Sequence, residues 1–177
     1  MTCSGPSSFE AVSKVVVERR SIRAYSSKMP PKEVIEKVLE VARWSPSGGN
    51  VQDWRFVVVT DAKLLRALRA FSPGWIASGN PAAIVICSDR KSTDKMGPLM
   101  HELRLIHVGI VAQTISLVAH SMGLGTCMIG SFSKPAVKKL LNLPDHWDPL
   151  LIMLIGYPER TPPPPPRLSL EEITMWR

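Results

Sequence analysis

Apolar residues in this chain form two kinds of pattern, spaced clusters that predict helices and continuous runs that predict strands. The spaced clusters predict helices at residues 8–19, 30–45, 62–70, 99–122 and 133–141. The continuous runs predict strands at residues 56–60, 82–87, 126–129 and 150–155. Because the two kinds of element alternate only loosely, we predict an α+β domain with a small central sheet covered by helices.

Residues with known positional preferences mark the ends of these helices. Ser7 or Ser8 is suited to cap the first helix, and the prolines at 30 and 31 are suited to open the second. The second helix must end before Pro46, since the residue before proline avoids helical backbone. Gly123 is placed to end the long fourth helix.

The fourth helix, at residues 99–122, is mostly apolar and carries the small residues Gly109, Ala112 and Ala119. Small residues allow another helix to approach closely. We therefore expect this helix either in the core or in a subunit interface.

The composition indicates one globular domain covering residues 1–177, because 45% of the residues are apolar. The formal net charge is +7, but basic residues are scattered among acidic ones apart from Arg19, Arg20 and Arg23. The chain has no long basic run and no zinc-finger spacing. Nucleic acid is therefore a poorly supported partner.

Cysteine usage and hydropathy predict a cytoplasmic protein that does not bind membranes. Cys3, Cys87 and Cys127 lie far apart and are odd in number, so they form no evident disulfide framework. The N-terminus lacks the apolar core of a signal peptide, and no apolar run approaches the roughly 18 residues of a membrane span.

The segment SPSGGNVQDW, at residues 45–54, joins a predicted helix to a predicted strand. Its adjacent glycines let the backbone approach a ligand closely, and the amides of Asn50 and Gln52 each offer a donor and an acceptor. This chemistry suits recognition of a flat heterocycle. The same residue types are common in turns, so an ordinary helix-to-strand turn is the alternative.

Arg19, Arg20, Ser21 and Arg23 place three guanidinium groups and a hydroxyl within five residues. A guanidinium can hold a phosphate through two parallel hydrogen bonds. The alternative is a solvated helix end, where basic side chains interact favourably with the helix dipole.

The segment GLGTCMIG, at residues 123–130, does not fit a dinucleotide fingerprint, because it follows a helix and opens a strand. Gly130 is then either a strand end or a point of close backbone approach to something flat. The four histidines lack metal-ligand spacing, so we expect no metal site. No local signature assembles a Ser/His/Asp or Cys/His arrangement, which indicates chemistry carried by a cofactor.

The C-terminal segment contains five consecutive prolines, Pro162 to Pro166, directly before Arg167. Such a run forms a stiff extended spacer of roughly 15 Å. It can deliver Arg167 to a fixed place, or it can serve as a ligand for an SH3-type domain.

Taken in order, the segments at 19–25, 45–54, 123–130 and 155–158, followed by Arg167, resemble the nitroreductase family of flavoenzymes. The resemblance spans nearly the whole chain. It implies a sandwich with a small, mainly antiparallel sheet flanked by helices, a strap at residues 158–177, and an intertwined homodimer with FMN at the interface.

The resemblance also implies which residues bind FMN. They are Arg19, Arg20, Ser21, Arg23, Pro46, Ser47, Gly48, Asn50, Gln52, Ile129, Gly130 and Arg167. The arginines and Ser21 would contact the phosphate and the pyrimidine, and the loop at 46–52 would meet the ring from the partner subunit. An amide at Ile129 or Gly130 would lie near flavin N5, so no side chain need act as a nucleophile.

The implied activity is a two-step cycle in which NAD(P)H reduces FMN and a nitroaromatic, quinone or similar acceptor then oxidises it. Oxidative, dehalogenating or flavin-consuming chemistry and a non-enzymatic flavin carrier are the alternatives. Asp53 stands where the family commonly has proline, so loop stiffness and local charge differ here. The sequence leaves open the acceptor, the choice between NADH and NADPH, and whether Cys127 or Asp53 tunes the flavin.

Overall fold

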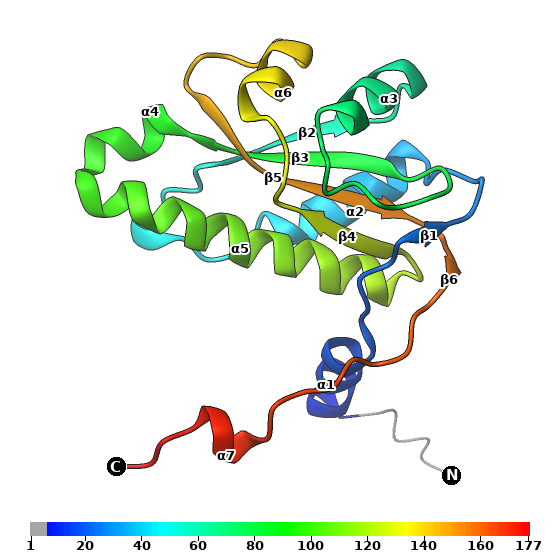
Figure 1. Ribbon diagram of the computed structural model, residues 1–177. Helices are drawn as coiled ribbons and strands as arrows, with labels where there is room; N and C mark the ends of the chain where they lie inside the picture. Colours follow the sequence, from blue (N-terminus) through cyan, green and yellow to red (C-terminus); the bar gives the residue numbers. More distant parts are fainter. Residues whose placement is uncertain (1–6) are drawn as a thin grey trace.

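The centre of the computed structural model, which describes residues 7–177, is a four-stranded antiparallel sheet (Figure 1). Its order is β2-β3-β5-β4. The strands are β2 (Trp54–Val59), β3 (Ala82–Asp89), β5 (Trp147–Gly156) and β4 (Gly125–Ile129). Every residue of β3 is buried, which explains why this strand has a continuous apolar run instead of an alternating pattern. The four predicted strands are thus confirmed, although β5 begins earlier than the prediction.

Helices cover both faces of this sheet (Figure 1). On one face lie α2 (Lys32–Ala42) and α5 (Pro98–Ser121), which contribute Ile35, Val38 and Ile115 to a core with Ile84 and Ile86 of β3. The opposite face carries α3 (Ala62–Ala70) and α6 (Lys134–Leu140). There the alternate β3 residues, such as Val85, pack with Leu68 and Val137. The predicted α+β architecture is confirmed.

The helix ends follow the predicted signals closely. Ser7 caps α1 (Ser8–Glu18), where it forms a reciprocal capping box with Glu10. Gly123 follows α5 with φ +75°, and the next amide, that of Leu124, donates to the carbonyl of Ala119. Pro135 lies in the first turn of α6, and Ser133 at its N-terminus makes no side-chain capping bond.

Several short elements were not predicted from the sequence. β1 (Ala24–Tyr25) pairs with β6 (Pro158–Arg160) in a second, two-stranded antiparallel sheet. The remaining short elements are η1 (Gly48–Asn50), α4 (Arg90–Thr93), η2 (Asp94–Met96) and α7 (Leu170–Ile173). They contain two to four residues each, which is too short for a hydrophobic period to be visible.

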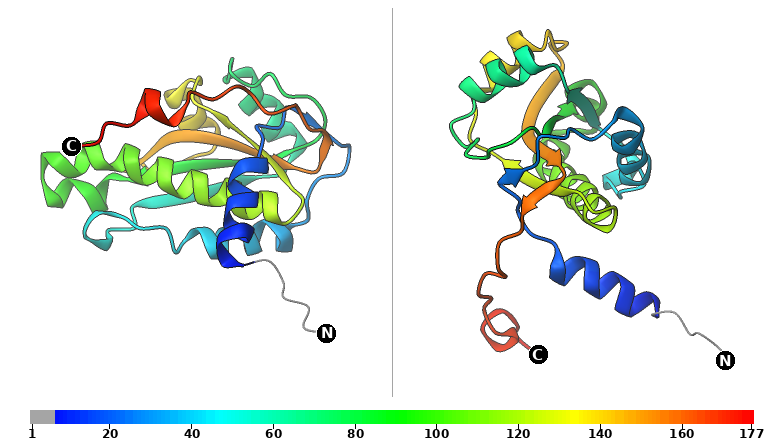
Figure 2. Two further views of the ribbon diagram at one scale, coloured as in Figure 1. Left: turned by 90° about the horizontal axis from the view of Figure 1, so that it is seen from below. Right: turned by 90° about the vertical axis from the view of Figure 1, so that its right-hand side faces the viewer.

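Both ends of the described chain extend away from the sheet (Figures 1 and 2). α1 has no buried residue, and its predicted apolar side is exposed, with Val12 64% and Val16 49% accessible. The C-terminal segment, which includes α7, is likewise exposed, and Trp176 is 87% accessible. Nothing in the described part of a single chain covers these apolar side chains.

The sequence expectation that no segment approaches a membrane span needs correction. α5 is long and apolar enough to cross a membrane by length and composition alone. In this fold Val111, Ala112 and Ile115 of α5 are fully buried against the sheet and α2. Burial in the core therefore explains why this helix is apolar.

Candidate functional site

The arginine-rich segment after α1 and the C-terminal proline strap meet at a cavity of about 270 Å³. Its lining residues come from these two segments alone and are Arg19, Arg20, Ser21, Arg23, Pro162, Pro163, Pro165 and Arg167. The cavity lining thus contains four guanidinium groups and one hydroxyl, and no carboxylate. Two segments that lie about 140 positions apart in the sequence therefore form one strongly positive recess suited to an anion.

Backbone pairing fixes the arginine segment to the sheet. The amide of Ile22 donates to the carbonyl of Thr126 at 2.9 Å, and Ser21 forms a parallel bridge with the same residue. A Cβ on Gly125 would lie 2.3 Å from Cγ1 of Ile22, so the close approach of the two segments requires glycine at this position. The arginines are consequently held beside β4, the last strand of the sheet.

The arginines in this recess have unequal surroundings. The Nε atom of Arg19 is buried and has no hydrogen-bond partner within the described part of the chain. Arg20 instead donates from Nη1 to the carbonyls of Val17, at 2.6 Å, and Arg19, at 2.9 Å. Arg20 therefore partly fits the helix-end alternative, whereas Arg19 retains a buried donor available to a ligand.

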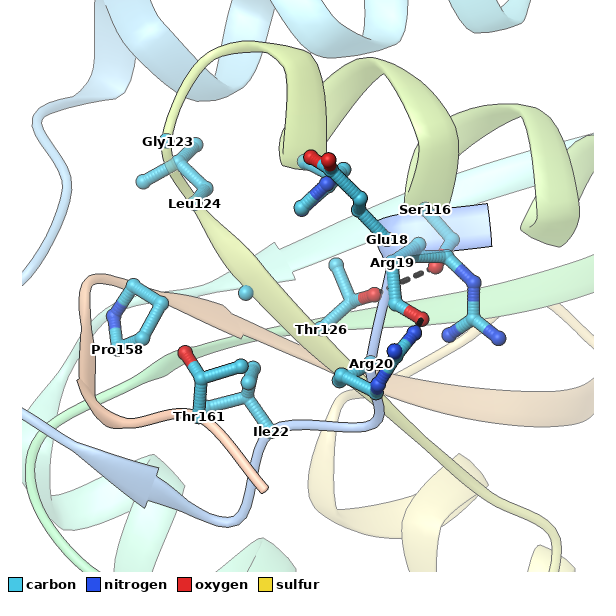
Figure 3. A pocket seen from close by; sticks show the side chains of 12 residues that line it. Glu18, Arg19, Arg20, Ile22, Ser116, Gly123, Leu124, Thr126, Pro158 and Thr161 are labelled. Carbon is cyan, nitrogen blue, oxygen red and sulfur yellow. Dashed lines mark hydrogen bonds between the residues drawn. The ribbon is translucent and has the colours of Figure 1, made fainter. Parts of the chain in front are cut away.

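A second, smaller cavity of about 220 Å³ adjoins this recess and shares Arg19 and Arg20 with it (Figure 3). Its walls come from the end of α1, the C-terminal half of α5, β4 and the segment near Pro158. Ser116 of α5 and Thr126 of β4 share a hydrogen bond of 2.7 Å between their hydroxyls there.

The backbone directly after β4 has open space beside it. Ile129 is buried, but a Cβ on Gly130 would meet no atom within 4 Å. Since strands rise about 3.3 Å per residue, Gly130 lies roughly 13 Å along the chain from the Thr126 pairing site. A flat ligand anchored at the arginine recess could therefore extend towards exposed amide groups at the strand end.

The loop at residues 45–52 has an unusual backbone. Gly49, Asn50 and Gln52 have φ values of +56°, +53° and +46°, in the left-handed region that Gln rarely adopts and Asn adopts more readily. The backbone amide of Gln52 donates to the hydroxyl of Ser47 at 3.0 Å, which closes the loop. Asn50 and Gln52 are exposed residues, and the side-chain amide of Gln52 donates from Nε2 to the carbonyl of Asn50 at 3.3 Å.

A buried polar network behind this loop was missed by the sequence analysis. Asp53 Oδ1 lies 2.7 Å from Nδ1 of His107, and the hydroxyl of Ser88 donates to Oδ2 of Asp53 at 2.6 Å. The amide of Gly48 donates to Nε2 of His107 at 2.9 Å. No local signature could have revealed this network, since Asp53 lies 35 positions from Ser88 and 54 from His107, and Ser88 contacts the carboxylate rather than the imidazole.

The structure does not bring all predicted site residues together within one chain. Gly48 faces Met100, Leu103 and His107 in the first half of α5, whereas the arginines adjoin Ser116 and His120 in its second half. From His107 to Ser116 the helix advances roughly 14 Å. The 46–52 loop and the arginine recess of one chain are thus separate half-sites.

Neither of the described cysteines adds a reactive group to this region. Burial raises the pKa of the Cys127 thiol, with partial compensation by the positive charge of Arg23, so the thiol stays protonated near neutral pH. Cys87 is also buried, and Cys3 lies outside the described residues. Among residues 7–177, no group of three or more His, Cys, Asp or Glu side chains could hold a metal ion.

Comparison with known proteins adds family-level information to this geometry. A family model described as the Nitroreductase family matches residues 16–103 and 79–157. A protein of Archaeoglobus fulgidus predicted to be an NADH dehydrogenase/NAD(P)H nitroreductase is 32% identical over 151 residues, which cover 82% of this chain and 84% of that protein.

Two solved structures share the fold over nearly the whole chain. NADPH:FMN oxidoreductase from Vibrio harveyi, crystallised with NAD⁺, is 25% identical with a TM-score of 0.84, covering 94% of this chain and 76% of that one. A protein from Bacteroides thetaiotaomicron, also predicted to be an NADH dehydrogenase/NAD(P)H nitroreductase, is 29% identical with a TM-score of 0.81. The match covers 93% of this chain and 96% of that one.

Proposed function

Because the chain belongs to the nitroreductase family, we propose that it is an FMN-dependent NAD(P)H oxidoreductase. The observation that carries the proposal is the recess of about 270 Å³, which is lined by Arg19 and Arg23 from the segment after α1 and by Arg167 from the C-terminal strap. Four guanidinium groups without a carboxylate suit the dianionic phosphate of FMN. The proposed electron acceptor is a nitroaromatic, a quinone or a similar small oxidised molecule.

The residues present fit an FMN phosphate. The buried Nε of Arg19 has no partner within residues 7–177, and a phosphate oxygen would supply one. Ser21 is fixed to β4 through its bridge with Thr126, so its hydroxyl is held at the same recess. Arg20 is engaged with backbone carbonyls and would contribute mainly positive charge.

The backbone at Ile129 and Gly130 would lie against the isoalloxazine ring. The open space at Gly130 would admit a flat ring, and a backbone N–H there would donate towards N5. When bound, FMN would supply the reversible hydride chemistry at N5. The protein's part is to bind and orient, since both ring nitrogens of the buried His107 are already hydrogen-bonded.

We propose that the active form is a homodimer with FMN at its interface. Pro46, Ser47, Gly48, Asn50 and Gln52 would then meet the flavin held by the partner's arginine recess. Two observations support this arrangement. The half-sites are separate within one chain, and the apolar residues of α1 and the C-terminal segment are uncovered. Such surface is suited to a second copy of the chain.

The remaining proposals concern organisation and location. We propose a single FMN-binding domain over residues 1–177, in which the strap at 158–177 uses Pro162–Pro166 as a spacer that positions Arg167. We also propose a cytoplasmic location, since Cys87 and Cys127 are free thiols, as is usual in a reducing compartment.

Steady-state kinetics test this function. With FMN-loaded protein, initial rates are measured while NADH or NADPH and a quinone such as menadione are varied. A two-step cycle predicts parallel lines in double-reciprocal plots, because the nucleotide leaves before the acceptor binds. Tight FMN binding without turnover on quinones, nitroaromatics or free flavin would instead favour a flavin carrier.

A further inference from the structure

The buried network behind the loop at residues 45–52 has no assigned role in the proposed reaction. We propose that His107 is a positioning residue that, held in one tautomer by Asp53, fixes the Gly48 backbone of the FMN-facing loop. This inference rests on the proposed function only in its claim that the loop meets FMN. The tether itself is defined by hydrogen bonds within the chain.

Donor and acceptor chemistry determines the tautomer. The Gly48 amide can only donate, so Nε2 of His107, at 2.9 Å, must accept and carry no proton. The ring proton then sits on Nδ1, from which it is donated to Oδ1 of Asp53 at 2.7 Å. The other carboxylate oxygen accepts from Ser88 at 2.6 Å. Each polar atom in this series of hydrogen bonds therefore has a defined role as donor or acceptor.

The network is anchored to strands β2 and β3 of the central sheet. Asp53 directly precedes β2, where Trp54 pairs with Ser88 of β3. The Asp53 carbonyl also accepts from the amide of Asp89 at 2.7 Å. Asp53 and Ser88 are fully buried and His107 is 2% exposed. The sheet thus holds the carboxylate, the carboxylate orients the imidazole on α5, and the imidazole holds the loop.

The loop needs such a tether because its backbone is strained. Asn50 and Gln52 both adopt positive φ, which costs a non-glycine residue free energy and persists only where neighbouring contacts enforce it. Contacts from side chains hold the loop backbone at three points, with His107 on the Gly48 amide, Ser47 on the Gln52 backbone amide and Arg55 on the Gln52 carbonyl. Loss of the histidine contact leaves a half-buried amide without an acceptor and lets the amide side chains of the loop lose their fixed positions.

A general-base role for His107 does not fit this geometry. The imidazole is buried, and both nitrogens are committed to partners within the chain. Acting on a substrate proton would require breaking the Gly48 contact. The residue therefore acts through the loop and not on the reacting atoms.

Two substitutions separate positioning from simple structural support. In His107→Gln the side-chain oxygen can occupy the place of Nε2 and accept from Gly48, while direct contact with Asp53 is lost. In His107→Asn the amide nitrogen can occupy the place of Nδ1 and donate to Asp53, but the side chain is too short to reach Gly48. The readouts are the dissociation constant for FMN from flavin fluorescence, thermal unfolding without FMN, and hydrogen exchange of the Gly48 amide.

We expect His107→Asn to weaken FMN binding by roughly five- to tenfold, as loss of one hydrogen bond to a preorganised loop predicts, and to accelerate Gly48 exchange. His107→Gln should bind FMN within about threefold of the wild type. Tight FMN binding by His107→Asn, or weakening in both variants that follows their loss of thermal stability, would overturn the proposal.

A measurement on the wild-type protein tests the proposal even if the variants do not fold. Nitrogen-15 NMR of the FMN-free protein should detect a scalar coupling across the hydrogen bond between Gly48 N and His107 Nε2, with Nε2 unprotonated. A protonated Nε2 or an absent coupling would overturn the tether. Wild-type protein that binds no FMN would contradict the proposed function. The NMR coupling would still show whether His107 accepts a hydrogen bond from the Gly48 amide, because that measurement does not require FMN.

Discussion

Arg19 has the environment most suited to a phosphate ligand among the residues of the recess. Its Nε is buried without a partner in the described chain, whereas Arg20 is occupied by two backbone carbonyls. A buried donor without an acceptor is unfavourable by about 1–3 kcal/mol, and a bound anion removes that cost. We therefore expect Arg19 to gain more from a bound phosphate than the other arginines of the recess.

Replacement of this arginine tests the phosphate assignment. We expect Arg19→Ala to weaken FMN binding at least tenfold, because a charge-assisted hydrogen bond contributes about 1.5–3 kcal/mol. Riboflavin, which lacks the phosphate, should bind the variant and the wild type equally. Fluorescence titration measures both ligands.

The matched control is Arg69→Ala, which removes an exposed arginine from the last turn of α3. It should leave both affinities unchanged. Equal losses for FMN and riboflavin in Arg19→Ala would contradict a phosphate contact and point to a general loss of structure.

The elements differ in how well their sequence predicts them. The longer helices and the central strands were predicted because each carries its own hydrophobic period or run. β1 and β6 were not, since two or three residues carry no period and the pairing joins Ala24 to Arg160. The contact between Asp53 and His107 was likewise missed, because these residues lie 54 positions apart in the sequence.

The same distinction between local patterns and long-range contacts applies to the candidate site. The sequence could predict which residue types favour a phosphate or a flat ring, because these are local motifs. It could not predict that Arg20 folds back onto Val17, or that Asp53 is buried against Ser88. Those contacts depend on how distant elements pack.

The junction between the arginine segment and β4 can be tested at the element scale. We expect Gly125→Ala to destabilise the protein by about 1–3 kcal/mol, because the new Cβ would lie 2.3 Å from Ile22 Cγ1 and 2.7 Å from its Cβ. Urea unfolding followed by circular dichroism measures this change.

Gly109→Ala in the middle of α5 serves as the control, since a Cβ there meets nothing within 4 Å. It should be neutral or should stabilise the protein by up to about 1 kcal/mol. An equal effect of the two substitutions would argue against a tight junction at Gly125.

At the scale of the whole molecule, the single chain has two incomplete features. The half-sites lie along different parts of α5. α1 projects away from the sheet (Figure 2), and the side chains of Val12 and Val16 are exposed. A groove of about 300 Å³ between α1 and α5, lined by Val12, Val16 and Leu117 among others, leaves further apolar surface open. A second copy of the chain would complete both features.

Charge placed on this surface should prevent association. We expect the wild type to sediment as a dimer and the double variant Val12→Asp, Val16→Asp to sediment as a monomer with weakened FMN binding. Buried apolar side chains contribute about 1.5–3 kcal/mol each, and a carboxylate cannot replace them. Lys14→Asp, on the other side of α1, should remain dimeric. A monomeric wild type that still binds FMN tightly would contradict the shared site.

The most direct test of the central claim is the visible absorbance spectrum of the freshly purified protein with free FMN removed. NADH and then NADPH are added without oxygen. We predict a bound-flavin spectrum that one or both nucleotides bleach. Protein that retains no flavin and cannot be reconstituted with FMN would contradict the account, as would a bound flavin that dithionite reduces but neither nucleotide does.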